Sequence, residues 1–489
     1  MASFKERKNI KLNQLSNDVL KIWEEENTFK KSVENRSENK PFVFYEGPPS
    51  SNGLPGIHHV MARALKDVFC RYKTLKGFRV NRKAGWDTHG LPVELSVEKK
   101  LGITKEDIGS KISVEEYNAA CKKAVMKYTD VWNDLTKKMG YWVDTNNPYV
   151  TYDNKYIESV WWLLNEAYEK NYIYKGYTIQ PYSPKAGTGL SSHELNQPGC
   201  YKQVKDTSIT AQFLLRPVNK AIFNVKEPVF FIAWTTTPWT LPSNTALAVN
   251  KKVEYVLVKT ANQYTHKSCC LILAKQRVPS VLRSPYVEKN SMVDESKQIP
   301  YEIIQHINGE DLIGLSYEQL IPLAEPHHGV GNAFKVIHGD FVSTEDGTGI
   351  VHIAPTFGAD DAKAAEKAGV PPMLTLNNEN ELVPLVNLQG KFIDKLGFLS
   401  DKFVKNAYYQ PENEPSRSVD VEIAIHLKEK NRAFKVEKYE HNYPHCWRTD
   451  KPILYYPLDS WFIKVSAFKE KMYDLNQKIN WKPASTGEG

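Results

Sequence analysis

The fold is decided by residues 41–87, PFVFYEGPPSSNGLPGIHHVMARALKDVFCRYKTLKGFRVNRKAGWD. The aromatic and β-branched residues of PFVFYEG predict a buried strand, which ends at the loop PPSSNGLPG. Apolar residues then recur every three or four positions from Ile57 to Leu75, which predicts one amphipathic helix that ends near Gly77. FRVNRKAGWD predicts a second strand. Residues 42–87 are therefore expected to form a strand–loop–helix–strand unit of a doubly wound α/β fold.

Ligands of a doubly wound sheet bind beyond the carboxyl ends of its strands. Residues 47–59 and 85–89 are therefore expected to meet at one pocket. His58 and His59 stand at the expected helix start, where backbone N–H groups attract phosphate and imidazoles can donate hydrogen bonds to it. This arrangement suits ATP, while Asp87 suits an ammonium group. The alternatives are a plain turn with solvated histidines and a turn-capping aspartate.

In the rest of the chain, the predicted secondary structure changes twice. Helical patterns rich in Trp and Tyr occupy residues 110–175, and a β-rich stretch from about residue 181 to residue 420 suggests an inserted domain. From His441, the aromatic runs HNYPHCWR and ILYYPLDSWFIKV indicate a return to the first domain. The expected boundaries are 1–45 for an N-terminal helical segment, 46–188 for the first part of a Rossmann domain, 189–425 for the insertion and 426–489 for the returning part.

Composition places the chain among ordinary globular proteins. Its 489 residues, 41% hydrophobic and 25% charged, predict two to four domains. No stretch approaches the roughly 20 apolar residues that span a bilayer, so we expect a cytoplasmic protein without a membrane segment. The formal net charge of +7 favours a polyanionic partner only weakly. The six scattered cysteines have no C-x-x-C spacing, which predicts reduced thiols.

Five motifs, in family order, resemble those of the class I aminoacyl-tRNA synthetases, and specifically the isoleucine enzymes: EGPPSSNGLPGIHH, GWDTHGLPVE, AWTTTPWTLPSNTALAV, GTGIVHIAPTFGADD and YPHCWR. The resemblance covers essentially the whole chain. It implies a Rossmann-type parallel sheet interrupted by an inserted β-rich editing domain. It also implies a monomer that activates isoleucine with ATP, as the magnesium complex, transfers it to tRNA(Ile) and hydrolyses misactivated valine. A related valine or leucine ligase is the alternative.

The resemblance places the family's HIGH signature at residues 56–59. Gly56 stands where the signature has its first histidine, and His58 stands where it has its glycine, while His59 is retained. The implied catalytic residues are His59 and His58. The implied ATP-binding residues are Gly47, Asn52, Gly56 and His59.

The same resemblance assigns a pocket for isoleucine. Pro48 and Asp87 match positions that line this pocket in the family, with Asp87 on the ammonium group of the amino acid. Trp461, in SWF, matches another wall of the pocket. A tryptophan buried in the core is the alternative for Trp461.

A second, hydrolytic site is chemically motivated, because one methylene is worth only about 1–3 kcal/mol of discrimination, a limit established for this enzyme family. In family terms, Asp361 would anchor the ammonium group of the misattached amino acid, in an open and solvated pocket. Without the resemblance, the TTT run is a strand end and the aspartate pair caps the next helix, a role that we expect for Asp360. The implied editing residues are Thr235, Thr236, Thr237, His352 and Asp361.

No structural zinc is expected. Some family members hold zinc with two C-x-x-C pairs, but the positions of the first pair are Ser183 and Ala186 here, and the second pair keeps Cys446 beside Thr449. One candidate ligand falls short of the four that a structural site needs.

The chain ends at WKPASTGEG, a stretch that resembles the family just before its second ATP signature, KMSKS. We therefore expect an N-terminal part without this signature or the anticodon-binding domain, one that makes little isoleucyl-adenylate alone. Two other functions are open for the chain as it stands. It would act only as a hydrolase of mischarged tRNA, or it would bind nucleotide or tRNA without catalysis.

Overall fold

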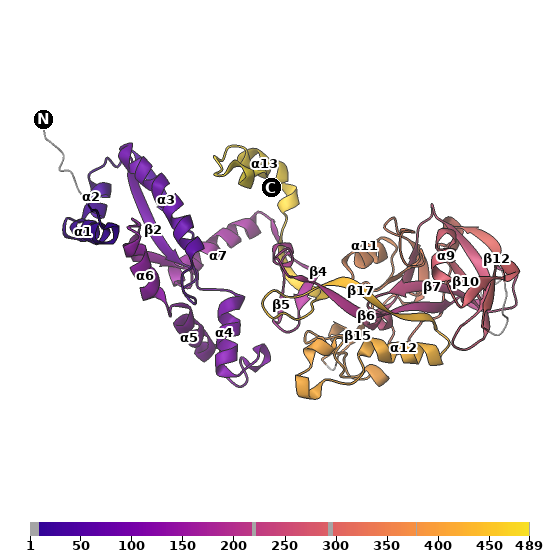
Figure 1. Cartoon of the computed structure of the whole chain (residues 1–489). Coiled ribbons are helices and arrows are strands. Elements are labelled where there is room, and N and C mark those ends of the chain that lie inside the picture. Colours follow the sequence, from indigo (N-terminus) through magenta and orange to yellow (C-terminus); the bar gives the residue numbers. More distant parts are fainter. Residues whose placement is uncertain (1–8, 218–221, 292–296, 378, 489) are drawn as a thin grey trace. The chain divides into compact units, whose positions relative to one another are not determined.

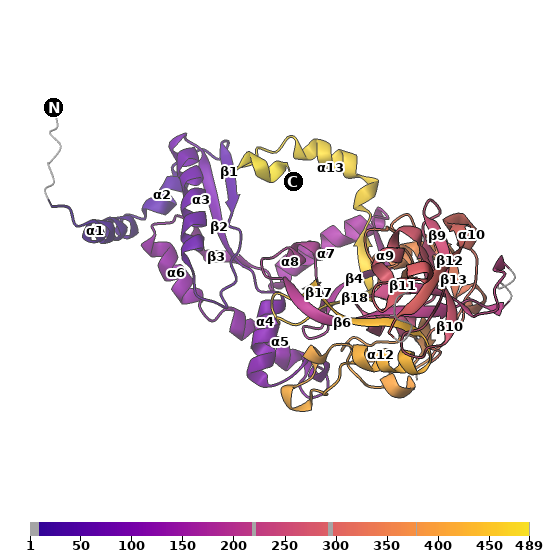
Figure 2. The ribbon, with the colours of Figure 1, turned by 45° about the vertical axis from the view of Figure 1, so that its right-hand side comes forward.

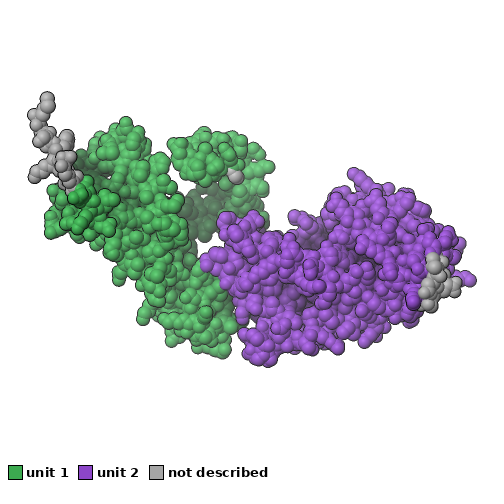
Figure 3. Space-filling view, in the orientation of Figure 1, with its two compact units in different colours: residues 1–174, 463–489 green, residues 175–462 purple. Residues whose placement is uncertain are grey.

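The chain forms two compact units in the computed structural model (Figure 3). The first unit contains residues 1–174 and 463–489, and the second contains residues 175–462. No described helix is long and apolar enough to cross a membrane. The structure describes residues 9–217, 222–291, 297–377 and 379–488, so the first eight residues of the expected N-terminal segment lie outside it.

The first unit is a small parallel sheet with helices around it (Figure 1). The strand order is β1-β2-β3, and both neighbouring pairs are parallel. The strands are β1 (Pro41–Tyr45), β2 (Arg79–Trp86) and β3 (Asp144–Val150). The helices are α1 (Leu12–Glu25), α2 (Thr28–Glu34), α3 (Ile57–Leu75), α4 (Leu91–Leu101), α5 (Val114–Val125), α6 (Thr129–Lys138), α7 (Asn154–Glu169) and α13 (Lys469–Asn476).

The predicted strand–loop–helix–strand unit is confirmed as β1, the loop after it, α3 and β2, and α3 runs alongside β2 in Figures 1 and 2. The predicted burial of its first strand is wrong, because β1 is an edge strand in which Val43 and Tyr45 are 60% and 62% exposed. In the part of the chain that the structure describes, most of the large apolar side chains of α3 are also exposed to solvent. Its buried side chains are Arg63, Cys70 and Thr74.

A hydrogen-bonded polar cluster lies under α3 in place of the expected apolar contact. Arg63 Nη1 donates to Thr136 Oγ1 of α6 at 2.6 Å, and Arg82 Nη2 of β2 donates to Thr74 Oγ1 at 2.9 Å. Arg82 Nη1 also pairs with Asp67 Oδ1 at 3.1 Å. Because buried charges are costly unless they are paired and hydrogen-bonded, these contacts fix how α3 lies on the sheet.

The second unit is β-rich, as predicted. Its main sheet has seven strands in the order β11-β12-β9-β10-β7-β6-β17, and smaller sheets have the orders β13-β8-β14, β15-β16 and β18-β4-β5. The strands are β4 (Ile173–Ser183), β5 (Thr188–Gly189), β6 (Tyr201–Leu214), β7 (Val229–Thr235), β8 (Ala246–Val249), β9 (Glu254–Ala261), β10 (Ser268–Ala274), β11 (Tyr286–Glu288), β12 (Ile299–Asn308), β13 (Lys335–His338), β14 (Val351–Ile353), β15 (Leu374–Leu376), β16 (Leu382–Pro384), β17 (Ala433–Pro444) and β18 (Leu454–Ile463).

The helices of this unit are short. They are α8 (Ser192–Leu195), α9 (Val278–Val281), α10 (Gly309–Leu312), α11 (Ala359–Lys367) and α12 (Val419–Glu429), and a 3₁₀ segment, η3 (Pro238–Ser243), follows β7. Fully buried side chains such as Phe213, Phe231 and Tyr255 form the core between the large sheet and these elements. The alternation of burial expected of a one-sided sheet is replaced in β7 by a nearly continuous buried run, since both faces of the strand are covered. The mixed α/β fold, with a parallel sheet and a β-rich part, is thus confirmed.

The compact second unit is wider than the predicted insertion of residues 189–425. Strand β6 pairs with β17 from Tyr201↔Pro444 to Ala211↔Ala433, and this pairing brings residues after 425 into the same unit. A compact unit and an inserted domain are different divisions of the chain, so the four predicted boundaries stay a prediction.

The turn that leads into β14 predicts a clear difference between two glycines. Gly347 and Gly349 both have a positive φ, of 64° and 77°, but a Cβ on Gly349 would overlap with the Cβ of Ala274, whereas one on Gly347 would only touch Trp234 at 3.5 Å. Gly347→Ala is expected to cost about 1–2 kcal/mol of unfolding free energy through backbone strain. Gly349→Ala is expected to cost about 1–3 kcal/mol more, because overpacking is added.

Urea unfolding of both variants and of the parent chain measures these costs. Equal losses for the two substitutions would contradict the assigned packing of Gly349 on Ala274.

Candidate nucleotide-binding and editing sites

The ends of β1 and β2 lie side by side in the first unit. Glu46 N donates to Lys83 O at 2.9 Å, and Asp87 N donates to Pro49 O at 3.0 Å, so the loop after β1 is attached to the end of β2. Pro48 and Asp87 are therefore close to the same strand ends. This is the edge at which a doubly wound sheet binds its ligands.

The loop after β1 is fixed by the helices that follow later in the chain. Trp132 Nε1 donates to Gly53 O at 2.8 Å, Tyr128 N donates to Ser51 O at 3.1 Å, and Ser51 Oγ donates to Val125 O at 2.6 Å. Because these bonds satisfy the polar groups of the loop, its position does not require a ligand.

His59 is held in one tautomer by the start of its own helix. Gly56 N donates to His59 Nδ1 at 2.9 Å, which leaves the proton of the neutral ring on Nε2. Burial lowers the pKa of His59, and His58 and Arg63 lower it further. The ring packs edge to face on Trp132, with 4.7 Å between the ring centroids. A neutral imidazole with a fixed Nε2–H donor is suited to an acceptor such as a phosphate oxygen.

Gly56 and His58 are sterically coupled. A Cβ built on Gly56 would lie 2.8 Å from Cε1 of His58, and the His58 and His59 rings are 3.8 Å apart. The His58 ring thus occupies the space that a side chain at position 56 would need. Relative to the HIGH signature, glycine and histidine are exchanged between positions 56 and 58 in the sequence, and a phosphate-binding role for the His58 ring stays a prediction.

Among the other sequence-predicted residues of this site, Gly47 is exposed, and Asn52 Oδ1 accepts from Ser50 Oγ at 3.3 Å within the loop. Asp87 is half-buried, accepts from His89 N at 3.4 Å and forms no ion pair among the described residues. Trp461 belongs to the second unit, on β18, and is 66% exposed. The alternative of a buried core tryptophan is therefore wrong. The roles of all these residues in binding stay predictions.

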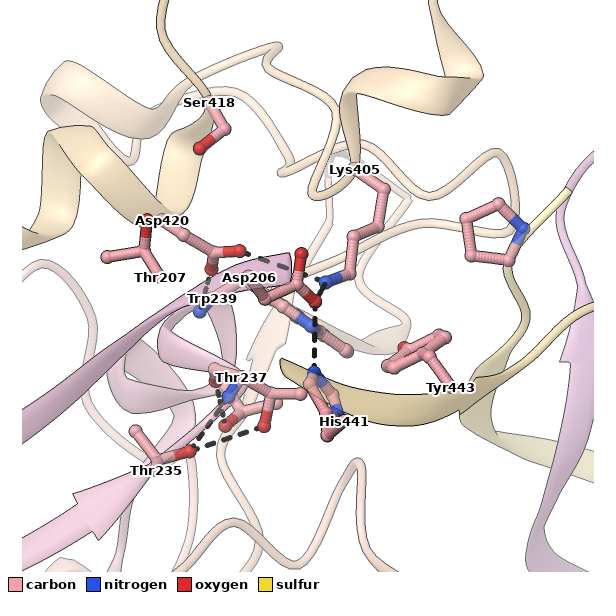
Figure 4. Close-up of polar contacts among 12 residues, drawn as sticks. Asp206, Thr207, Thr235, Thr237, Trp239, Lys405, Ser418, Asp420, His441 and Tyr443 are labelled. Carbon is pink, nitrogen blue, oxygen red and sulfur yellow. Dashed lines mark hydrogen bonds and ion pairs between the residues drawn. The ribbon is translucent and has the colours of Figure 1, made fainter. Parts of the chain in front are cut away.

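The threonine run lies at the end of β7, where the chain turns into η3 (Figure 4). Thr235 is buried, and its Oγ1 accepts from Thr237 N at 3.1 Å, while the two hydroxyls are 3.3 Å apart. Thr236 and Thr237 are half-buried. The segment thus presents hydroxyl groups from a backbone that its own side chains hold in place.

Thr240, which was not among the editing residues predicted from the sequence, joins the threonine run to His352. Thr240 Oγ1 donates to Thr237 O at 2.9 Å and lies 3.1 Å from His352 Nε2. Because its own proton is used on Thr237, the Thr240 oxygen accepts from the Nε2–H of His352. The spacing of Thr237 and Thr240 was the available signal, since residues three apart share one side of a 3₁₀ turn.

His352 is buried and electrically neutral. Burial lowers its pKa to about 4. With Nε2 donating to Thr240, Nδ1 carries the free lone pair, and this atom has no hydrogen-bond partner among the described residues. A buried acceptor without a partner costs free energy, so it marks a place where a water or substrate hydroxyl would be bound.

Asp361 reaches the same strand from the first turn of α11. Its Oδ2 accepts from Ala354 N at 2.8 Å, two residues after His352. Burial raises the pKa of Asp361 to about 6, against the lowering effect of the Ala354 bond, and Asp360 raises it further. The expectation of an open, solvated pocket is wrong, because this carboxyl group is half-buried and bound to the backbone.

Asp360 does not cap the helix. The N-cap of α11 is Gly358, without a side-chain cap, and Asp360 is an exposed residue that pairs with Lys363 at 3.6 Å. The predicted capping role of Asp360 is therefore wrong. Of the two adjacent carboxylates, that of Asp361 faces inward, onto Ala354 N, and that of Asp360 faces outward.

The positions of the zinc-binding pairs do not fit a metal. Ser183 is fully buried and its Oγ accepts from Ala186 N at 3.2 Å, while Cys446 is a buried free thiol. Over the described ranges, no group of three or more His, Cys, Asp or Glu side chains could hold a metal ion. The absence of zinc from the protein stays a prediction.

Comparison with known proteins gives consistent matches along the chain. The family model of the class I tRNA synthetases (I, L, M and V) matches residues 18–489. Curated proteins named isoleucine–tRNA ligase from Bacteroides fragilis and Cytophaga hutchinsonii are 56% and 57% identical over 99% of this chain and 44% of their own length. The one from Clostridium acetobutylicum is 43% identical over 97% of this chain and 40% of its own length.

The chain spans less than half the length of these curated relatives. A solved structure described as the crystal structure of GlLeuRS-CP1 is 17% identical, with a TM-score of 0.31, and covers 48% of this chain and 100% of that one. From the family model that matches almost all of its residues, the chain belongs to the class I tRNA synthetases of the isoleucine, leucine, methionine and valine group.

Proposed function

We propose that the chain is part of an isoleucine–tRNA ligase and that its second unit hydrolyses tRNA(Ile) carrying valine. The observation that carries the hydrolytic part is the hydrogen-bonded series Thr235–Thr237–Thr240–His352, with Asp361 attached to Ala354 beside it. The names and identities of the curated relatives support isoleucine as the amino acid.

In the proposed hydrolysis, we assign each polar group of the site a role that agrees with its hydrogen bonds. Thr236 and Thr237 present hydroxyls to the terminal adenosine and to a water molecule. His352 Nδ1 accepts a hydrogen bond from that water or from a ribose hydroxyl, since burial keeps its ring neutral. Asp361, when ionised, accepts the ammonium group of valine through the carboxylate oxygen that Ala354 does not use.

In the proposed synthesis, the first unit binds ATP and isoleucine. His59 donates through Nε2 to a phosphate oxygen as charge develops there, and His58 lies beside it. Gly47, Asn52 and Gly56 line the nucleotide, while Asp87 receives the ammonium group of isoleucine. Magnesium arrives as part of the ATP substrate.

Other parts of the proposal concern the whole protein. We place it in the cytoplasm as a monomer whose partners are isoleucine, ATP and tRNA(Ile). Pro48 is assigned to the isoleucine pocket. The insertion is assigned to residues 189–425, which carry every proposed editing residue.

The first prediction from the proposed function separates the charge of Asp361 from its structural bond. Asp361→Asn keeps an acceptor for Ala354 N but loses the charge, so Val-tRNA(Ile) hydrolysis should fall about ten- to a hundredfold while the melting temperature stays near that of the parent. Asp361→Ala should lose the same activity and, in addition, about 1 kcal/mol of stability, because Ala354 N loses its partner.

Asp360→Ala is the matched control. Its exposed pair with Lys363 contributes little, so both hydrolysis and stability should match the parent. Deacylation rates and thermal melts of the three variants test this. An Asp361→Asn chain that hydrolyses Val-tRNA(Ile) at the parent rate would rule out the assigned role, and a parent chain that binds tRNA without hydrolysis would favour the binding-only alternative.

The second prediction concerns pH. Since the pKa of Asp361 is raised to about 6, its carboxylate is present above that pH and is protonated as the pH falls through it. Valine binding should weaken as the charge is lost, so kcat/KM for Val-tRNA(Ile) should decline below about pH 6. The Asp361→Asn variant should lack this decline, and the same fall in both proteins would assign the titration to another group.

The third prediction concerns His59. His59→Ala removes the fixed Nε2–H donor, and hydrogen bonds to charged groups contribute about 1.5–3 kcal/mol, so the affinity for Mg-ATP should fall at least tenfold. His58→Ala should change it less, because His58 is exposed and holds no comparable bond among the described residues. Isothermal calorimetry measures both, and a larger loss for His58→Ala would reverse the two assignments.

A further inference from the structure

A buried ion cluster lies against η3 in the second unit (Figure 4). The Lys405 cluster consists of Lys405, Asp206 and Asp420. Lys405 Nζ is 2.9 Å from Asp206 Oδ2 and 3.8 Å from Asp420 Oδ2, and Lys405 and Asp420 are both buried. Asp206 lies on β6, 199 positions before Lys405, while Lys405 stands ahead of α12 and Asp420 lies on α12.

The Lys405 cluster is bonded directly to the threonine segment. Asp420 Oδ1 accepts from the backbone N–H of Trp239 at 2.9 Å. Trp239 stands between Thr237 and Thr240, whose oxygens form the path to His352. The orientation of the Trp239 peptide therefore sets the positions of both hydroxyls.

Helix capping does not explain Asp420. The N-cap of α12 is Ser418, whose Oγ accepts from Val421 N, so the first turn already has its cap. The carboxylate of Asp420 instead points to another element, as Figure 4 shows. Burial raises the pKa of Asp420 to about 6, and Lys405 opposes this rise. A lone buried carboxylate would be costly, so Lys405 keeps Asp420 in its ionised, acceptor form.

Several neighbouring groups keep the Lys405 ammonium group protonated. Burial alone would lower its pKa, but Asp420, Tyr443 and Asp206 together raise that pKa above the ordinary value. Its Nζ lies 4.7 Å from the centre of the Tyr443 ring, and His441 Nε2 is 3.4 Å from Asp206 Oδ2.

These groups border a cavity of about 470 Å³ lined by Asp206, Lys405, Asp420 and Tyr443. The Lys405 cluster thus borders this cavity on one side and is bonded to the threonine segment on the other.

A contribution to stability alone is a weak explanation for such an arrangement. Buried ion pairs often gain little over apolar side chains of similar size, because desolvation offsets their attraction. They do fix geometry when every member is hydrogen-bonded. Here the bond that leaves the ion cluster ends on the one backbone amide that lies between two proposed editing threonines.

We propose that Asp420 and Lys405 are positioning residues for the hydrolysis of mischarged tRNA. Asp420 fixes the Trp239 peptide, so that Thr237 and Thr240 stay aligned with His352, and Lys405 fixes Asp420. This inference rests on the proposed editing function of the second unit.

The test compares three variants in the full chain. Asp420→Ala should lower kcat for Val-tRNA(Ile) hydrolysis at least tenfold with KM changed less than threefold, since the threonines are displaced but the groups that bind tRNA remain. Asp420→Asn, whose amide oxygen still accepts from Trp239, should recover activity to within about threefold of the parent. Lys405→Met should fall between these two.

Glu422→Gln is the matched control on the same helix. Glu422 pairs with Lys402 at 2.6 Å and makes no bond to η3 among the described residues, so its loss should leave kcat unchanged. Hydrogen–deuterium exchange at the Trp239 amide gives a readout without substrate. Exchange there should be faster in Asp420→Ala than in Asp420→Asn or the parent.

The outcomes separate the two proposals. A parent chain that does not hydrolyse Val-tRNA(Ile) removes the proposed editing function, and the positioning role with it. An active parent whose Asp420→Ala variant keeps the parent kcat overturns the positioning role alone. Equal losses of kcat in Asp420→Ala and Asp420→Asn, in step with equal losses of melting temperature, also overturn it. If Asp420→Ala does not fold, a parent kcat in Lys405→Met overturns it, and a lowered kcat at unchanged KM supports it.

Discussion

The second unit depends on the pairing of β6 with β17. This antiparallel ladder joins residues 201–211 to residues 433–444, which are more than two hundred positions away in the chain. It brings the two ends of a long β-rich segment together, and a segment whose ends meet can be inserted into another domain without disturbing it. The same ladder carries Asp206 on one strand and His441 and Tyr443 on the other, so closure of the unit also assembles one wall of the Lys405 cluster.

Burial shifts the pKa values of the histidine and the aspartate of this unit in opposite directions, and the two shifts determine their protonation states. It lowers the pKa of His352 to about 4 and raises that of Asp361 to about 6. At neutral pH the imidazole is therefore neutral and the carboxylate is ionised. This combination provides an acceptor for a water molecule and a counter-charge for an ammonium group, which are the two requirements of the proposed hydrolysis.

The sequence predicted the local parts of the fold and missed those that depend on distant partners. Strand β1, α3 and β2 follow one another directly, so periodicity and turn residues were sufficient to predict them. A run of aromatic and β-branched residues shows that a strand is apolar but not what covers it, and for this reason the predicted burial of β1 was wrong. Likewise, Asp360 and Asp361 are adjacent, and only the position of Ala354 shows which of them faces inward.

The two candidate sites also differ in how far apart their residues lie in the sequence. Pro48, His59 and Asp87 come from one continuous stretch, so local patterns alone predicted a shared pocket, and Asp87 N does bond to Pro49 O. The editing residues come from β7, η3, β14 and α11, and they were predicted only through the resemblance to a family. Lys405 and Asp206 are 199 positions apart, and no local pattern marks either of them. Local sequence patterns therefore predict groups of residues from one continuous stretch more readily than groups that long-range contacts bring together.

Glycine and histidine are exchanged between positions 56 and 58 relative to the HIGH signature, and the two positions compete for the same space. In the proposed synthesis, the start of α3 receives a phosphate at its backbone, and a nearby ring donates to that phosphate. In the family signature the ring comes first and the glycine third. Here the glycine comes first, and a Cβ at its position would lie 2.8 Å from the His58 ring, so a side chain at position 56 would force this ring to move. His59 keeps its place because its Nδ1 is bound by the backbone of Gly56, an interaction that any residue with an N–H group at position 56 could supply.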